Sequence, residues 1–274
     1  MFRSSLLRTA LALTARSQAV PARLVASSTA ASRVTSRAMA TTTPAIPRDA
    51  IAELQRYTAC DVSDALLKLN VPGAGFVADL QAYGAPAPDA DAETSAVTAA
   101  PVSTILFAAK GAPPPAEPPA NVPKDAHWAD LAREGTLVFM QQPPGQTNAI
   151  CGGIMALRMK VRGVKGVVVA GRVRDLPELR STNLPIWAYG TSTVGSGGGS
   201  IPWALEAPLS INGTVVRPGD VALHDPVNGV VVIPRDKLDA VLELLPRLTA
   251  ADDKVKEDVL KGMSVYDAFK LYRG

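Results

Sequence analysis

Residues 163–175 read GVKGVVVAGRVRD, an apolar run that ends at a glycine and is followed by an arginine and an aspartate side by side. Three consecutive valines, 167–169, are typical of a strand that is covered on both faces of a sheet. In open α/β sheets, ligands bind just beyond the carboxyl ends of such strands. Arg174 and Asp175 are therefore candidate site residues, because an arginine can grip a carboxylate and an aspartate can hold a hard cation.

The same pair has a simpler interpretation. Arg-Asp dipeptides also form local surface ion pairs, and Asp175 could cap the helix that follows it. Spacing alone does not separate the two interpretations, and the buried strand in front of the pair favours a site.

Patterns on both sides of this strand predict the fold class. The apolar spacing indicates a short strand, a helix, a second short helix and a further strand at residues 137–140, 151–162, 176–180 and 185–188. This alternation predicts a layered α/β sandwich with a central sheet. An Asn-Gly pair at 212–213 predicts a hairpin, and helical spacing from Leu238 onward predicts C-terminal helices.

The N-terminal half is less regular. Residues 51–69 read as a helix followed by a second helical turn, with Ser63 and Asp64 as its caps. Residues 95–101 and 103–109 read as two strands. Residues 111–123 contain six prolines and a glycine, which predicts an exposed loop.

Composition limits the classes of function. The chain has 274 residues, of which 47% are hydrophobic, enough for one sizeable core, and no apolar run approaches the roughly 20 residues of a membrane helix. Residues 1–48 hold seven of the 28 basic residues and no acid, so the remainder has 21 basic and 25 acidic residues. We therefore expect no nucleic-acid or membrane partner.

The acid-free N-terminus is rich in arginine, serine and alanine, the composition of a mitochondrial transit peptide. We expect a presequence and disordered linker over residues 1–40, a single domain over residues 41–274, and a location in the mitochondrial matrix. The alternative is a disordered tail without a targeting role. A start at Met39 would give a shorter, cytosolic form.

Thiol and imidazole groups are scarce. The chain has two cysteines, Cys60 and Cys151, and two histidines, His127 and His224. Their spacing suits no zinc centre, so any metal is expected to be hard and oxygen-bound. His127 and Asp130 are interpreted as a capped surface helix or, alternatively, as a proton-transfer pair.

Two glycine-rich segments are candidate anion sites. Gly152 and Gly153 open the helix predicted next to the central strand, where free backbone N–H groups can hold a carboxylate. A tight turn is the alternative. Residues 194–200 lack the Gly-Lys-Ser/Thr ending of a phosphate loop and are interpreted as a linker or an active-site flap.

The combined motifs resemble the RraA-like family, which includes 4-hydroxy-4-methyl-2-oxoglutarate aldolases and related oxaloacetate decarboxylases. The resemblance covers about residues 51–272 and is greatest to the fungal branch. It rests on GxxGVVVxGxVRD at 163–175, LPIWAxG at 184–190, HWxDLA at 127–132, GT at 135–136, QQP at 141–143, PGD at 218–220 and NGV at 228–230.

The resemblance implies an α/β fold assembled as a homotrimer or hexamer, with a Mg²⁺ or Mn²⁺ site and no organic cofactor. It implies that Asp175 binds the metal, that Arg174 holds the oxygen atoms of a small 2-keto acid, and that both are catalytic. The loop whose backbone binds the keto acid corresponds to Gly152, Gly153, Ile154 and Met155. The implied reaction breaks a C–C bond and gives pyruvate through an enolate.

One position departs from the family pattern. Members with lyase chemistry have an acidic residue 21 positions before the arginine, where this chain has Gly153. General acid–base catalysis contributes about 10²–10⁴-fold, so its loss would weaken aldol cleavage. Candidate replacements, from this subunit or a neighbour, are Asp130, Glu206 and Asp225.

Two functions follow. The first is a metal-dependent lyase of 2-keto acids, which the intact Arg174-Asp175 pair favours. The second is a non-catalytic binding or regulatory protein, which Gly153 favours, since the family's namesake is a ribonuclease-binding regulator. A different metal-dependent hydrolase lacks a matching nucleophile motif.

Overall fold

The computed structural model describes residues 45–84 and 97–273. The expected presequence and the Met39 start lie outside these ranges. Residues Thr43–Gly274 form one compact unit. None of the helices in the described ranges is long and apolar enough to cross a membrane.

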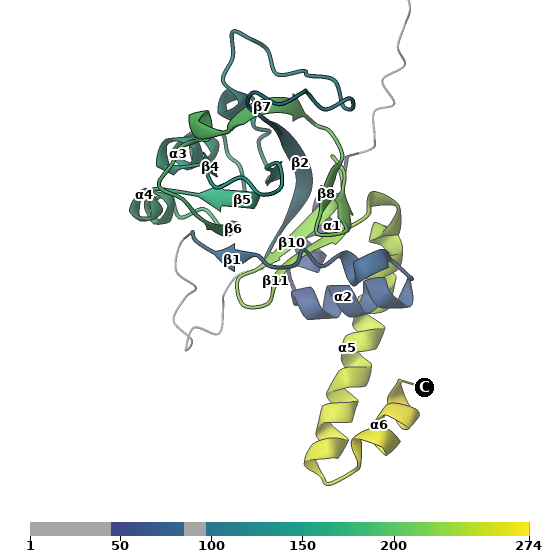
Figure 1. Cartoon of the computed structure of the whole chain (residues 1–274). Coiled ribbons are helices and arrows are strands. Elements are labelled where there is room, and N and C mark those ends of the chain that lie inside the picture. The colour runs from purple at the N-terminus through teal and green to yellow at the C-terminus, as the bar shows by residue number, and fades with distance from the viewer. Residues whose placement is uncertain (1–44, 85–96, 274) are drawn as a thin grey trace, which may run out of the picture. The chain divides into compact units, whose positions relative to one another are not determined.

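Helices and strands alternate through the middle of the chain (Figure 1). The α-helices are α1 (Arg48–Leu54), α2 (Ala59–Lys68), α3 (Gly153–Val161), α4 (Leu176–Ser181), α5 (Leu238–Leu260) and α6 (Val265–Tyr272). The strands are β1 (Gln81–Ala82), β2 (Thr98–Ala109), β3 (Leu137–Gln141), β4 (Ala149–Cys151), β5 (Gly166–Val173), β6 (Ile186–Thr191), β7 (Ser200–Leu205), β8 (Leu209–Ile211), β9 (Thr214–Val216), β10 (Val221–Asp225) and β11 (Gly229–Ile233). Short 3₁₀ turns are η1 (Pro72–Gly75), η2 (Trp128–Leu131), η3 (Ser196–Gly198) and η4 (Arg235–Lys237).

Nine of these strands form one mixed sheet in the order β1-β6-β5-β3-β2-β10-β11, with β4 added to β5 and β7 added to β2. The pairs β2–β3, β3–β5, β5–β6 and β4–β5 are parallel, and the others are antiparallel. Parallel neighbours require crossovers: α3 supplies the one between β3 and β5, α4 the one between β5 and β6, and the loop with η2 connects β2 to β3. The sheet with its helices confirms the predicted layered α/β class.

The central strands are buried on both faces, which explains their unbroken apolar runs. In β3, Val138 and Met140 pack with α3 and α4, whereas Leu137 and Phe139 face a second cluster that includes the β8–β9 hairpin. A third cluster joins α1, α2 and α5 to β10 and β11. Figure 1 shows α3 and α4 side by side next to β5, with α2 and α5 near β10 and β11.

Two local predictions were wrong. The segments 95–101 and 103–109 were expected to be separate strands, but residues 98–109 form one strand, β2, that passes through Pro101. The helix α2 begins at Ala59, where Thr58 forms a capping box with Asp61. Ser63 does not cap a helix, because its hydroxyl donates to the carbonyl of Ala74 at 3.2 Å.

Other local predictions are confirmed. Hairpin β8–β9 turns at the Asn-Gly pair, and the C-terminal segment forms α5 and α6, with Ser264 as the N-cap of α6. No helix or strand occurs between Ala109 and Trp128. The proline-rich loop is held to β7, because the Asn121 side chain bonds both backbone groups of Leu205 and the Trp203 indole donates to Pro118.

Candidate active site

Arg174 and Asp175 lie in the turn between β5 and α4. The Arg174 backbone N–H donates to the carbonyl of Cys151 at 3.0 Å, which ties this turn to the end of β4. Arg174 Nε donates to Asp175 Oδ2 at 3.0 Å. Their side chains are 40% and 33% exposed, and ion pairs this open contribute about 0–1 kcal/mol to stability. The pair therefore contributes little to the stability of the fold.

Asp175 has an unusual backbone conformation. It is the N-cap of α4 with φ 59° and ψ 50°, in the left-handed region that Asp tolerates better than most residues. Its side chain makes no capping hydrogen bond to α4, although its carbonyl accepts from the Leu179 N–H at 3.0 Å. The expected alternative, a side-chain cap, is therefore not what the structure shows, and the carboxylate is available to the pocket beside it.

Gly152 and Gly153 bring the start of α3 against this pair. Gly152 is the N-cap of α3 and offers no side-chain cap to the first turn of the helix. A Cβ at Gly152 would lie 2.9 Å from Asp175 Oδ2 and 3.0 Å from Arg174 Cγ. The first N–H groups of α3, which have no partner within the helix, thus lie close to the Arg174-Asp175 pair.

These residues line a pocket of about 200 Å³. Of the sequence-predicted site residues, the structure brings Gly152, Ile154, Met155, Arg174 and Asp175 together there. Gly153 is not among the lining residues; it is buried at the first position of α3. The remaining lining residues are His127, Trp128, Ala149, Ile150, Cys151, Gly195 and Ser196.

The other lining residues show what the pocket can do. Burial raises the pKa of Cys151 to about 12, so this thiol is a packing group and not a nucleophile. His127 Nδ1 accepts from the Ala129 N–H at 3.2 Å, which leaves Nε2 to carry the proton of a neutral ring. Gly195, from the segment interpreted as a flap, approaches Arg174, since a Cβ there would lie 3.1 Å from Nη1.

Three acids were predicted as proton donors, and all three are engaged elsewhere in this subunit. Asp130 pairs with Arg158 at 2.5 Å, so it forms no pair with His127. Glu206 accepts from Ser103 and pairs with Arg133 at 2.9 Å.

Asp225, the third of these acids, is buried at the end of β10. Burial favours a raised pKa, but hydrogen bonds from Ala59, Asn228 and Val227 outweigh it and hold the pKa of Asp225 below its usual value. None of the three acids lines the pocket. A role for any of them in a neighbouring subunit's site stays a prediction.

A hard divalent cation fits the donors of this pocket. Asp175 is the one acidic side chain among its described lining residues. Across residues 45–84 and 97–273 there is no cluster of three or more His, Cys, Asp or Glu side chains suited to a metal. Mg²⁺ commonly binds through one or two carboxylates and keeps several waters or substrate oxygens. A single carboxylate is compatible with Mg²⁺ or Mn²⁺, and not with a tetrahedral zinc centre.

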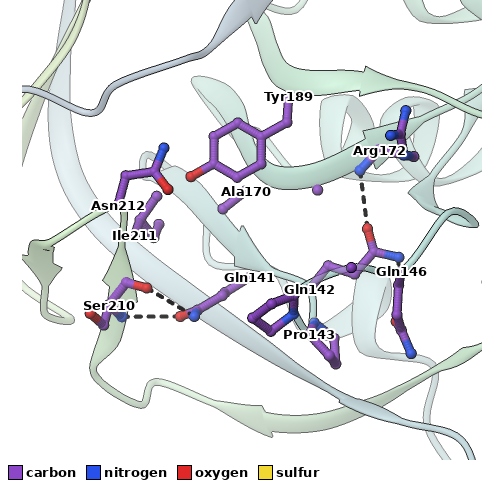
Figure 2. Close-up of a pocket in the computed structure, with 13 residues that line it drawn as sticks. Gln141, Gln142, Pro143, Gln146, Ala170, Arg172, Tyr189, Ser210, Ile211 and Asn212 are labelled. Atoms are coloured by element: carbon purple, nitrogen blue, oxygen red, sulfur yellow. Dashed lines mark hydrogen bonds between the residues drawn. The ribbon is translucent and has the colours of Figure 1, made fainter.

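A second pocket, of about 310 Å³, lies beside the ends of β3 and β5 (Figure 2). Its lining includes Gln141, Gln142, Arg172, Tyr189 and Asn212, and no carboxylate. Figure 2 shows Gln141 paired with the backbone of Ser210 and the backbone of Arg172 donating to Gln142.

The tyrosine of this second pocket is not an acid–base group. Burial, and then the charge of Asp79, raise the pKa of Tyr189 to about 12. This larger pocket offers no carboxylate to a divalent cation. The Asp175 pocket is therefore the better candidate for metal-assisted chemistry.

The comparisons agree with this fold. A family model described as RraA-like, Aldolase/RraA, matches residues 59–232. A protein of Halalkalibacterium halodurans named "Putative 4-hydroxy-4-methyl-2-oxoglutarate aldolase" is 33% identical over 126 residues, 46% of this chain and 59% of that protein. An uncharacterized protein of Methanocaldococcus jannaschii is 32% identical over 127 residues, 45% of this chain and 59% of its own length. The chain thus spans less than two thirds of these curated relatives.

Solved structures support the fold alone. An uncharacterized Pseudomonas syringae protein superimposes with a TM-score of 0.67 and 20% identity, covering 84% of this chain and 99% of that one. Streptomyces coelicolor RraAS2, described as an unusual member of the RNase ES inhibitor RraA protein family, superimposes with a TM-score of 0.60 and 22% identity. That match covers 81% of this chain and 100% of RraAS2.

Proposed function

The chain belongs to the RraA-like family, and from that membership and the pocket around Asp175 we propose that it is a divalent-metal-dependent C–C lyase of 2-keto acids. The proposed reactions are aldol cleavage of 4-hydroxy-4-methyl-2-oxoglutarate, decarboxylation of oxaloacetate, or both, each giving pyruvate. The names of relatives at 30–33% identity support the first reaction. The second is proposed because both reactions pass through the same enolate.

One observation carries the proposal. The Arg174-Asp175 pair and the uncapped start of α3 converge on one small pocket. A guanidinium and free backbone N–H groups are donors suited to a carboxylate and to a keto oxygen. The Asp175 carboxylate beside them is suited to a divalent cation, which the carboxylate and keto oxygens of the substrate also bind.

Each residue then has a role in binding or charge stabilisation. We assign Arg174 to the keto oxygen, where its donors stabilise the negative charge that develops as the C–C bond breaks. The backbone N–H groups of Gly153, Ile154 and Met155 are assigned to the substrate carboxylate. Mg²⁺ or Mn²⁺ held by Asp175 supplies further positive charge next to the reacting carbonyl. No organic cofactor and no Schiff-base lysine are needed.

Assembly and location are part of the proposal. A homotrimer or hexamer is supported by the exposed apolar face of α3, where Ile154, Leu157 and Val161 are 72%, 56% and 68% exposed. The composition of the N-terminus supports import into the mitochondrial matrix, and Met39 supports a second, cytosolic form.

A non-catalytic binding protein is the second candidate. It is favoured by Gly153, which provides no carboxylate at the start of α3, and by the lack of any acid other than Asp175 among the described lining residues. Such a protein would keep the pocket as a ligand site without turnover.

Pyruvate release from oxaloacetate tests the choice. The full-length protein is assayed with and without Mg²⁺, beside Asp175→Asn, with the spontaneous metal-promoted reaction subtracted. Metal-dependent turnover that Asp175→Asn removes is the result expected of a lyase. Turnover equal to the protein-free background, both with oxaloacetate and with 4-hydroxy-4-methyl-2-oxoglutarate, would contradict the lyase and favour the binding protein.

A further inference from the structure

Glu178 occupies the space beside Gly153. It lies in the first turn of α4, three residues after Asp175. A Cβ at Gly153 would overlap Glu178 Oε2 and Cβ and would lie 2.8 Å from Glu178 Cδ. The missing side chain at residue 153 therefore leaves room for a carboxylate that comes from a different helix.

This carboxylate is free to act. Within the described ranges, the Glu178 carboxylate makes no hydrogen bond and no ion pair, and its side chain is exposed. The Glu178 backbone carbonyl accepts from Ser181 Oγ at 2.7 Å. Asp130, Glu206 and Asp225 are all bonded elsewhere. Among the described residues, Glu178 is thus an uncommitted acid that packs against the start of α3, two of whose first three residues line the pocket.

The proposed reaction, on which this inference rests, needs a proton carrier. In aldol cleavage the substrate hydroxyl loses a proton as the C–C bond breaks. The electron pair of the C–C bond passes to the pyruvate enolate, and the enolate carbon then gains a proton. In oxaloacetate decarboxylation CO₂ leaves and the carbon gains a proton from water. Asp175 is assigned to the cation, so another group has to guide this proton.

We infer that Glu178 is the positioning residue for this proton transfer. Its carboxylate accepts a hydrogen bond from a water at the start of α3, and that water takes the hydroxyl proton and returns one to the enolate carbon. Glu178 acts through water because it does not itself line the pocket. It does from α4 what an acid at residue 153 would do from α3.

The position of the Glu178 charge predicts how kcat and KM change when it is removed. Glu178 packs against the start of α3, where the substrate carboxylate is expected to bind, and the two negative charges repel each other. Removing the charge should therefore lower kcat without raising KM. A purely structural contact would instead raise KM or lower the unfolding temperature.

The first measurement is steady-state kinetics on the full-length Glu178→Gln protein. We expect kcat to fall by about 10–100-fold, toward the lower end of acid–base effects, with KM unchanged or lower. Glu134→Gln is the matched control, because Glu134 also packs over a glycine, Gly163, with its Cγ 2.9 Å from where a Cβ would stand, and is not a lining residue of the pocket. We expect wild-type kinetics from this control.

The second measurement moves the carboxylate back to α3. Glu178→Gly removes the acid together with its Cβ, which would otherwise overlap a Cβ at residue 153. The double variant Gly153→Asp with Glu178→Gly then places an acid in the cleared space. We expect the double variant to recover at least about tenfold in kcat over Glu178→Gly. Thermal unfolding of each variant checks that folding is retained.

The outcomes separate the two proposals. A wild-type protein without metal-dependent turnover overturns the lyase and the role of Glu178 together. An active wild type whose Glu178→Gln variant keeps kcat within about threefold, or whose double variant is no better than Glu178→Gly, overturns only the role of Glu178.

Discussion

The Asp175 carboxylate lies against the Cα of Gly152, so closely that a Cβ there would stand 2.9 Å from Oδ2. This contact joins the turn before α3 to the turn before α4. It places the free N–H groups of one helix beside the carboxylate at the start of the other. The geometry of the proposed site therefore depends on a glycine that contributes no side chain to it.

Gly152→Ala should lower activity more than stability. The backbone at Gly152, with φ −136°, is open to any residue, but a methyl group would press on Asp175 Oδ2 and Arg174 Cγ. Misplacement by about 1 Å can cost about 10²-fold in rate, so we expect kcat/KM for oxaloacetate to fall at least tenfold. Gly197→Ala is the control, since a Cβ at Gly197 meets no atom within 4 Å. Equal activity of the two variants would contradict this reading of the contact.

Arg174→Lys should separate binding from stability. A lysine keeps the charge but loses the planar fork, which matters where an arginine grips a carboxylate or keto oxygen. Because the ion pair with Asp175 is 40% and 33% exposed, the free energy of unfolding should change by less than about 1 kcal/mol. We expect kcat/KM to fall about tenfold or more, measured beside urea unfolding. A large loss of stability with normal kcat/KM would make the pair structural.

The layered fold was predictable because the central strands are buried on both faces. Segments 137–140 and 167–169 are apolar on both faces, so they are recognisable in the sequence as buried strands. The single strand β2 was not predictable, because Pro101 reads as a strand end. It is tolerated opposite Val221, and the ladder continues through Val102, whose N–H donates to Asp220 at 2.8 Å.

The candidate site was predictable only in part. Arg174, Asp175 and the glycine pair stand out because each lies at the end of an apolar element. Glu178 was missed, since no spacing rule says that a residue of α4 will fill the space beside Gly153. The available signal was a glycine at a position where a carboxylate was expected, which implied that another side chain could occupy the space.

Asp225→Asn should destabilise the fold and leave the chemistry intact. Asp225 accepts hydrogen bonds from the backbone of Ala59 at 3.0 Å and Val227 at 2.9 Å, and so ties the start of α2 to the β10–β11 turn. An amide places donors where these N–H groups need acceptors, and charge-assisted bonds contribute about 1.5–3 kcal/mol each. We expect a loss of that order in urea unfolding with kcat unchanged. A loss of kcat at normal stability would instead point to a role in a neighbouring subunit's site.

His224 should make stability depend on pH between about 7 and 4. It is buried beside the Trp187 ring, whose centroid lies 5.8 Å away, and within the described residues its Nδ1 has no hydrogen-bond partner. Burial lowers the pKa of His224 to about 4 from the usual 6.5. The unfolded chain therefore binds a proton more readily than the folded one across this window. Stability is full above the unfolded pKa and falls as the pH drops from 6.5 toward 4.

The loss attributable to His224 is on the order of 2 kcal/mol at pH 5. Urea unfolding of wild type and His224→Leu at pH 7 and pH 5 measures it. We expect the difference in unfolding free energy between the two pH values to be smaller in the variant by about that amount. The pH 5 limit keeps the measurement above the range where Asp225 titrates, because the pKa of that carboxyl is held low. Parallel pH dependence in the two proteins would contradict this prediction, because the imidazole would then bind a proton equally well in the folded and the unfolded chain.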